Sequence, residues 1–230
     1  MLNLIAAAAF FVLLHLLVSG TRLRGALVGA IGEGPYMGLF SLASVGGLAW
    51  LIVAFAAARG GAGDVGWWSA ARPTRHLAAA IQLVAFLFIV PGLLTKNPAS
   101  VKQEGALDDP DVARGMLRVT RHPFLWGVAV WAAGHLLVNG RLADLILFGS
   151  LLALALLGPP SIDAKRRAAL GDRYAAFEAM TSNVPFAAIA AGRQSFKIGE
   201  IGAWRILLAV LVWAAVLWAH PLLFGVSPLG

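Results

Sequence analysis

The sequence contains no cysteine, which excludes disulfide bonds, thiolate metal ligands and cysteine nucleophiles. Charged residues are also scarce, at 13% of the chain, whereas a soluble domain usually contains about 25%. Hydrophobic residues make up 60% of the chain and lie in long blocks. This pattern indicates one integral membrane domain covering residues 1–230 rather than several soluble domains.

Six apolar segments approach or exceed the length needed to cross a hydrocarbon core of about 30 Å at about 1.5 Å per helical residue. We therefore predict an all-α integral membrane bundle with about six transmembrane helices. We expect Asn139–Arg141 to form a tight turn between the fourth and fifth spans, and Gly158–Pro160 to end the fifth. The predicted spans are Leu2–Ser19, Tyr36–Ala58, His76–Leu94, Pro123–Val138, Leu142–Leu157 and Ala203–Phe224.

Two polar segments between the spans carry further helix signals. Asp111 is placed to cap a short helix over Val112–Val119. The segment Asp163–Met180 mixes cations with alanine, leucine and aromatic residues. We predict that this second segment forms an amphipathic helix along the cytoplasmic membrane surface.

The formal net charge is +7, which in a soluble protein would suggest a nucleic-acid partner. In a membrane protein, an excess of Lys and Arg mainly reports orientation, so we expect lipid and no nucleic acid as the partner. Most of the 18 Lys and Arg residues fall in the first, third and fifth loops. The positive-inside rule then predicts periplasmic termini and large cytoplasmic loops. The oligomeric state stays open.

Two segments together resemble a known family. The first contains Arg121-His122-Pro123 within residues 115–127, and the second contains Gly171-x-x-Tyr174-x-x-Phe177 followed by Val184-Pro185-Phe186. This combination is similar to the wider group of isoprenylcysteine carboxyl methyltransferases. A first span ending in His15 and Ser19-Gly20, and a fourth span ending in residues 134–140, resemble the NnrU family within that group.

The resemblance carries specific implications. NnrU-like proteins are bacterial inner-membrane proteins linked to denitrification. A plastid relative, 15-cis-zeta-carotene isomerase, is a membrane enzyme that uses haem b, and its proposed ligand histidines correspond to His15 and His135 here. That enzyme also has a cysteine where this chain has Ala132, so thiolate ligation of haem is excluded in this chain.

His15 and His135 are the candidate metal ligands. An ionisable side chain inside a span is costly and by default indicates a functional site. Two neutral imidazoles can ligate one haem iron without sulfur. Alternatively, each histidine hydrogen-bonds a main-chain carbonyl or a hydroxyl group in the bundle. Counted from the cytoplasmic side, the two differ in depth by about 12 Å, so the pairing rests on the resemblance.

Arg121 and His122 are candidates for holding an anionic group, such as a haem propionate or a bound cofactor. A guanidinium group suits a carboxylate because it donates two parallel hydrogen bonds. The structural alternative is an elbow in which Pro123 begins the fourth span and Arg121 reaches lipid phosphates.

The candidates for a cytoplasmic lid over the same cofactor are Asp163, Lys165, Arg167 and Tyr174. The alternative is that the cations of this segment only meet anionic lipid head groups. In the related methyltransferases this region helps bind S-adenosylmethionine. Those enzymes carry more acidic residues at the start of the second motif than this chain, which has Asp163 followed by Lys165.

These features favour a haem b-binding membrane protein with a redox role, or a haem- or NO-linked role, in nitrogen oxide metabolism. The enzymatic form of this hypothesis is an isomerase acting on a lipophilic polyene. One alternative is a membrane methyltransferase that uses S-adenosylmethionine. Another is a non-catalytic membrane partner in the assembly of a different complex.

Overall fold

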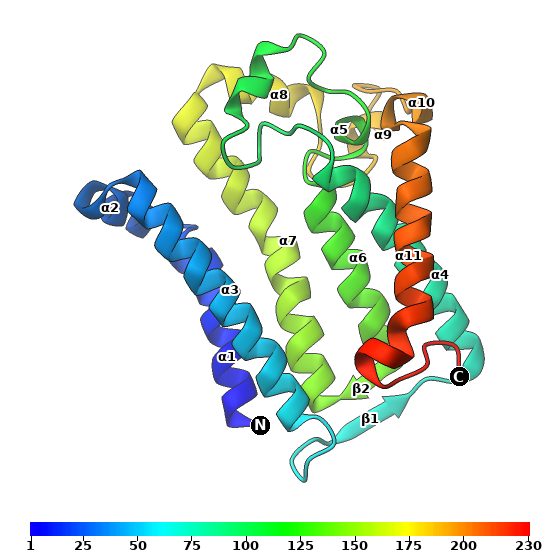
Figure 1. Ribbon diagram of the computed structural model, residues 1–230. Helices are drawn as coiled ribbons and strands as arrows, with labels where there is room; N and C mark the ends of the chain where they lie inside the picture. Colours follow the sequence, from blue (N-terminus) through cyan, green and yellow to red (C-terminus); the bar gives the residue numbers. More distant parts are fainter.

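The computed structural model describes all 230 residues as a helical bundle, with one small sheet at the end where both termini lie (Figure 1). The long helices are α1 (Leu2–Leu13), α3 (Glu33–Ala58), α4 (Arg72–Leu93), α6 (Pro123–Val138), α7 (Leu142–Leu170) and α11 (Ala203–Phe224). The shorter elements are η1 (Leu14–Val18, a π-helix), α2 (Arg22–Ile31), β1 (Gly66–Ser69), η2 (Glu104–Asp108, a 3₁₀-helix), α5 (Met116–Val119), β2 (Asn139–Arg141), α8 (Asp172–Met180), α9 (Ala187–Ala190) and α10 (Ile198–Ile201).

The predicted all-α membrane bundle is confirmed. Helices α3, α4, α7 and α11 are long and apolar enough to cross a membrane. A fifth candidate span is α1 continued through η1, which is bent by 81° relative to α2. Helix α6 has only 16 residues, but it lies among the long helices (Figure 1). Each of the six predicted spans therefore falls on one of these helices.

Glycines bring α4 and α6 close together. A Cβ atom added at Gly127 would lie 2.5 Å from Ile89 Cγ1 and 2.8 Å from the Ile89 main-chain nitrogen. Further along α6, a Cβ atom at Gly134 would lie 2.5 Å from Gln82 Nε2. Helix association in a bilayer depends on van der Waals packing, and small residues permit this close approach.

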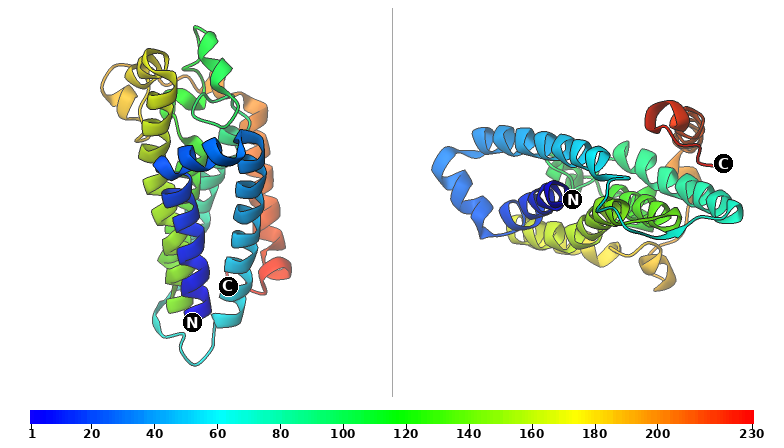
Figure 2. Two further views of the ribbon diagram at one scale, coloured as in Figure 1. Left: turned by 90° about the vertical axis from the view of Figure 1, so that its left-hand side faces the viewer. Right: turned by 90° about the horizontal axis from the view of Figure 1, so that it is seen from below.

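The pair formed by α1 and α3 packs on the rest of the bundle chiefly through α7 (Figure 2). The main core cluster lies where these helices and α6 meet. Its buried residues are Leu4, Ala7, Ala8, Phe11, Leu51, Ala54, Ala58, Ala132, Ala143, Leu147 and Phe148.

The prediction that the fifth span ends at Gly158–Pro160 was wrong. Helix α7 continues through both prolines to Leu170. Proline removes one helical hydrogen bond, but a transmembrane helix tolerates it where neighbouring groups satisfy the freed carbonyl. The predicted single helix over Asp163–Met180 is also wrong. Gly171 has φ +55° and separates the end of α7 from α8. The charged end of α7 therefore extends the bundle axis, and only α8 turns away from it.

One further local prediction was wrong. Asp111 lies in a turn, where its main-chain N–H donates to Asp109 Oδ1 at 2.9 Å, and it caps no helix. The following helix, α5, begins only at Met116, after Gly115 with φ +58°. The tight connection predicted at Asn139–Arg141 is confirmed, because these three residues join α6 directly to α7. They also form strand β2, which pairs antiparallel with β1, and this pairing was not predicted because it joins segments about 70 residues apart.

Candidate functional site

A polar cluster lies where α6, α7 and α8 meet, at the end of the bundle opposite the termini (Figure 1). Arg121 donates two hydrogen bonds to Asp163 Oδ2, from Nε at 2.9 Å and from Nη2 at 2.7 Å. His122 Nε2 lies 2.8 Å from Asp163 Oδ1, and the Tyr174 hydroxyl donates to that same oxygen at 2.7 Å. One carboxylate thus connects three segments of the chain. We call this group, with Glu178 and Arg167, the Asp163 cluster.

Main-chain contacts fix the segment that delivers Arg121 and His122. The Arg121 N–H donates to the Ser182 carbonyl at 2.9 Å, and Asn97 Nδ2 donates to the Arg121 carbonyl at 2.8 Å. His122 stands at the N-cap position of α6, followed by Pro123, whose fixed φ suits the first helical turn. The elbow predicted at Arg121-His122-Pro123 is therefore held from both sides.

Glu178 belongs to the cluster and was missed from the sequence. Its Oε1 lies 3.5 Å from Arg121 Nη2, and Arg167 donates to both of its carboxylate oxygens at 2.7 Å. Glu178 is four residues after Tyr174 in α8, so the two side chains share a helix face. This four-residue spacing is the sequence signal from which Glu178 could have been predicted as part of the cluster.

Burial gives the cluster its electrostatic character. His122 and Asp163 are each 4% exposed, and Tyr174 is fully buried. Burial, and secondly the neighbouring Asp163 carboxylate, raise the pKa of Tyr174 well above its ordinary value, so its hydroxyl is a hydrogen-bond donor at neutral pH. The guanidinium fork of Arg121 is engaged by Asp163 and does not face an open anion site. Pro123 begins α6, as the structural alternative expects, but Arg121 contacts Asp163 instead of reaching lipid phosphates.

Lys165 lies apart from the cluster. Its Nζ donates to the Ser19 carbonyl at 2.9 Å and lies 3.4 Å from Ser19 Oγ. The contact ties α7 to the residue that follows η1. Of the four residues predicted to form a lid, the structure places Asp163, Tyr174 and Arg167 in the Asp163 cluster. It places Lys165 against the first span.

His15 lies in the π-helix η1, a feature that often marks functional sites. Its Nδ1 lies 2.8 Å from the Phe11 carbonyl oxygen. Its ring packs against Phe11 at 4.5 Å and against Phe40 of α3 at 5.4 Å between ring centroids. No protein atom hydrogen-bonds its Nε2.

His135 lies in the last turn of α6 and has a comparable arrangement. Its Nδ1 lies 2.9 Å from the Trp131 carbonyl oxygen, and Gln82 Nε2 of α4 is 3.2 Å from the same ring nitrogen. The ring stacks on Phe148 of α7 with 4.5 Å between centroids. Nε2 again has no hydrogen-bond partner within the protein.

The structure does not bring His15 and His135 together. His15 contacts α3, whereas His135 contacts α4 and α7. Val12 lines a groove with Ser150, and a Cβ atom at Gly20 would lie 2.9 Å from Ser161 Oγ. If positions along α1 and η1 are matched to α7 through these two relationships, His15 lies level with a point about six residues after Phe148. That offset is about 9 Å along the axis of α7.

A haem bound by both His15 and His135 would have to span this offset between η1 and α6. The surroundings of His135 fit a haem ligand. A ligand histidine typically donates Nδ1–H to a carbonyl and binds the metal through Nε2. The Trp131 carbonyl supplies that partner, and Nε2 is unpaired.

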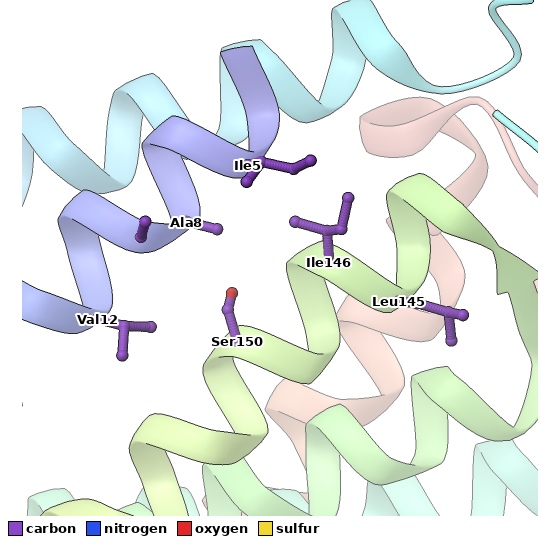
Figure 3. Close-up of a pocket in the computed structure, with 7 residues that line it drawn as sticks. Ile5, Ala8, Val12, Leu145, Ile146 and Ser150 are labelled. Atoms are coloured by element: carbon purple, nitrogen blue, oxygen red, sulfur yellow. The ribbon is translucent and has the colours of Figure 1, made fainter. Parts of the chain in front are cut away.

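An apolar groove of about 370 Å³ lies between α1 and α7. Figure 3 shows Ile5, Ala8 and Val12 of α1 facing Ile146 and Ser150 of α7. The Ser150 hydroxyl donates to the Leu147 carbonyl at 2.8 Å. The groove therefore presents a hydrocarbon surface without an unpaired donor.

Comparison with known proteins identifies the family. The sequence model described as NnrU protein matches residues 3–228. The chain belongs to the NnrU family. The resemblance predicted from the sequence is confirmed.

Two curated relatives are similar to this chain, and both are chloroplastic 15-cis-zeta-carotene isomerases. The protein from Arabidopsis thaliana is 29% identical over 150 residues, which cover 63% of this chain and 40% of the relative. The protein from Zea mays is 28% identical over 114 residues, which cover 48% of this chain and 30% of the relative. The matched regions span less than half of either relative. No solved structure matches.

Proposed function

We propose that this membrane protein of the NnrU family binds haem b and isomerises a lipophilic polyene. The observation that carries the proposal is His135, an imidazole on a membrane-bundle helix with Nδ1 on a main-chain carbonyl and Nε2 unpaired. The similarity to two carotene isomerases supplies the substrate class. The haem- or NO-linked role in nitrogen oxide metabolism, and a bacterial inner membrane with periplasmic termini, are parts of the same proposal.

His135 is the proposed axial ligand, and His15 receives a different role. His15 lies one helical turn after Val12, which lines the groove, and its own ring packs against Phe40 of α3. The proposal therefore places His15 at one end of the substrate groove and not on the same iron. This assignment replaces the shared haem expected from the resemblance.

Haem b supplies one-electron exchange when it is bound. The residues of this chain orient the substrate and exclude water from it. Ala8 and Ala9 leave room along α1, and Ile146 forms the opposing wall on α7. A polyene that moves from the lipid into this groove meets an almost entirely apolar lining, so the groove suits a hydrocarbon substrate.

The first experiment is the absorption spectrum of the protein, purified in mild detergent with added haem, combined with a pyridine haemochrome assay. We expect near-stoichiometric haem b, lost in His135→Ala and retained in His15→Ala. His76→Ala is the matched control, because this exposed histidine of α4 hydrogen-bonds only the Arg72 carbonyl of its own helix. A protein that stays colourless with added haem, or that keeps haem after His135→Ala, contradicts the ligand assignment.

The second experiment tests the isomerase activity by chromatography of a cis-polyene incubated with the haem-loaded, reduced protein. Ala9 lines the groove and is exposed, so Ala9→Trp fills the groove and should reduce isomerisation while haem content stays unchanged. Normal turnover in Ala9→Trp contradicts the groove assignment. Binding of S-adenosylmethionine in a calorimetric titration would instead favour the methyltransferase alternative.

A further inference from the structure

Helices α4 and α11 lie on the side of the bundle away from α1 (Figure 2). A second groove, of about 280 Å³, lies between them. Ala79, Ala80 and Leu83 of α4 form one wall, and Trp213 and Leu217 of α11 form the other. The Trp213 indole N–H donates to the Ala79 carbonyl at 3.1 Å, so the ring is held in place with its apolar body in the groove.

Two arginines converge beyond one end of this groove. Arg72 and Arg75 occupy the first turn of α4. A Cβ atom at Gly230 would lie 3.6 Å from Arg75 Nη1 and 3.9 Å from Arg72 Nε, so both guanidinium groups surround one position. The adjacent residue, Leu229, lines the groove. The cationic and apolar surfaces are therefore continuous.

These two cations differ from the other arginines at the same end of the bundle. Arg59 pairs with Asp144, and Arg141 pairs with Asp64. No Asp or Glu side chain lies within ion-pair distance of Arg72 or Arg75. Both guanidinium groups lie beside Gly230, next to the residue that lines the end of the groove.

We propose that this surface binds one anionic phospholipid. The phosphate contacts Arg72 and Arg75, where the first turn of α4 adds a favourable helix dipole. One acyl chain follows the groove past Ala79 to Leu83. Eight residues separate Arg75 from Leu83, about 12 Å along the helix, which is a depth that a lipid chain reaches from its head group. A free phosphate would leave the apolar groove unused, so the charge and the groove together favour a lipid.

Thermal unfolding in a neutral detergent tests the head group. We expect phosphatidylglycerol to raise the unfolding temperature of the wild type, and neither phosphatidylcholine with the same chains nor inorganic phosphate to do so. The double variant Arg72→Ala/Arg75→Ala should lose this rise, whereas Arg22→Ala, an unpaired cation at the opposite end, should keep it. Equal stabilisation by phosphatidylcholine or by inorganic phosphate, or a full rise in the double variant, overturns the proposal.

Fluorescence quenching tests whether the acyl chain lies in the groove beside Trp213. Phosphatidylglycerol carrying bromine on its acyl chain should quench Trp213, measured as the difference between the wild type and Trp213→Phe. Brominated phosphatidylcholine at the same concentration should quench this difference signal several-fold less. Absence of Trp213 quenching alongside a preserved thermal shift would show that the lipid binds outside the groove, and would overturn the placement of the chain.

Discussion

Arg121 and Asp163 are joined by two hydrogen bonds to one carboxylate oxygen, although 42 residues separate them in the chain. The pair is almost completely enclosed, with 12% of the Arg121 side chain and 6% of the Asp163 side chain exposed. A buried pair of this kind contributes little when intact, but losing one partner leaves an uncompensated charge. The connection between α6 and α7 therefore depends on both residues.

Asp163→Asn should destabilise the protein by about 3–5 kcal/mol, because Arg121 keeps its charge without its main acceptor. Denaturant unfolding in detergent measures the change. Asp172→Asn is the control, since Asp172 is exposed and forms no ion pair, and it should change stability by less than about 0.5 kcal/mol. Similar effects of the two substitutions would contradict the role given to the Asp163 cluster.

The two tyrosines of the chain form a matched pair for a second test. Tyr174→Phe removes a hydrogen bond to a charged carboxylate and should cost about 1.5–3 kcal/mol. The Tyr36 hydroxyl is buried without a partner, so Tyr36→Phe should be neutral or stabilising. Thermal unfolding of both variants checks the order, and a larger loss in Tyr36→Phe would refute it.

The Glu200 carboxylate should make the stability of the protein depend on pH. Hydrogen bonds from Arg118 lower the pKa of Glu200 from 4.5 to about 2. A lowered folded-state pKa gives stability that is present above the unfolded value of 4.5 and is lost as pH falls towards 2. The stability difference between wild type and Glu200→Gln should therefore be largest near neutral pH and shrink across this window. A difference that stays constant down to pH of about 2 would exclude this linkage.

Gly127 tests the close packing of α4 and α6. Gly127→Ala drives a methyl group into the main chain and side chain of Ile89 and should cost about 1–3 kcal/mol. Gly149 of α7 has no atom within 4 Å of an added Cβ, so Gly149→Ala should be neutral or stabilising by up to about 1 kcal/mol. Unfolding temperatures of the two variants provide the comparison, and a harmless Gly127→Ala would disprove the tight interface.

Local sequence signals predicted several elements closely. The observed bounds of α6 and α11 are those expected, because Pro123 and Gly202 mark the starts of continuous apolar runs. The continuation of α7 through Pro159 was not predictable from local signals. It depends on packing against other helices, which is invisible in a single apolar run.

The candidate site was predicted in part. The motifs named Arg121, His122, Asp163 and Tyr174, and the structure joins all four. Lys165 was grouped with them although it is two residues from Asp163, and residues at that spacing do not share a helix face. The separation of His15 from His135 depends on how α1 sits against α7, and no motif specifies that relationship.

The attachment of α1 and α3 chiefly through α7 has a mechanical consequence. Polar contacts secure this pair near both ends, through Lys165 with Ser19 and Arg59 with Asp144. Between these two contacts the side chains that line the groove of Figure 3 are apolar except for Ser150. The two polar contacts therefore set how far the helix pair stands from α7 on either side of the groove.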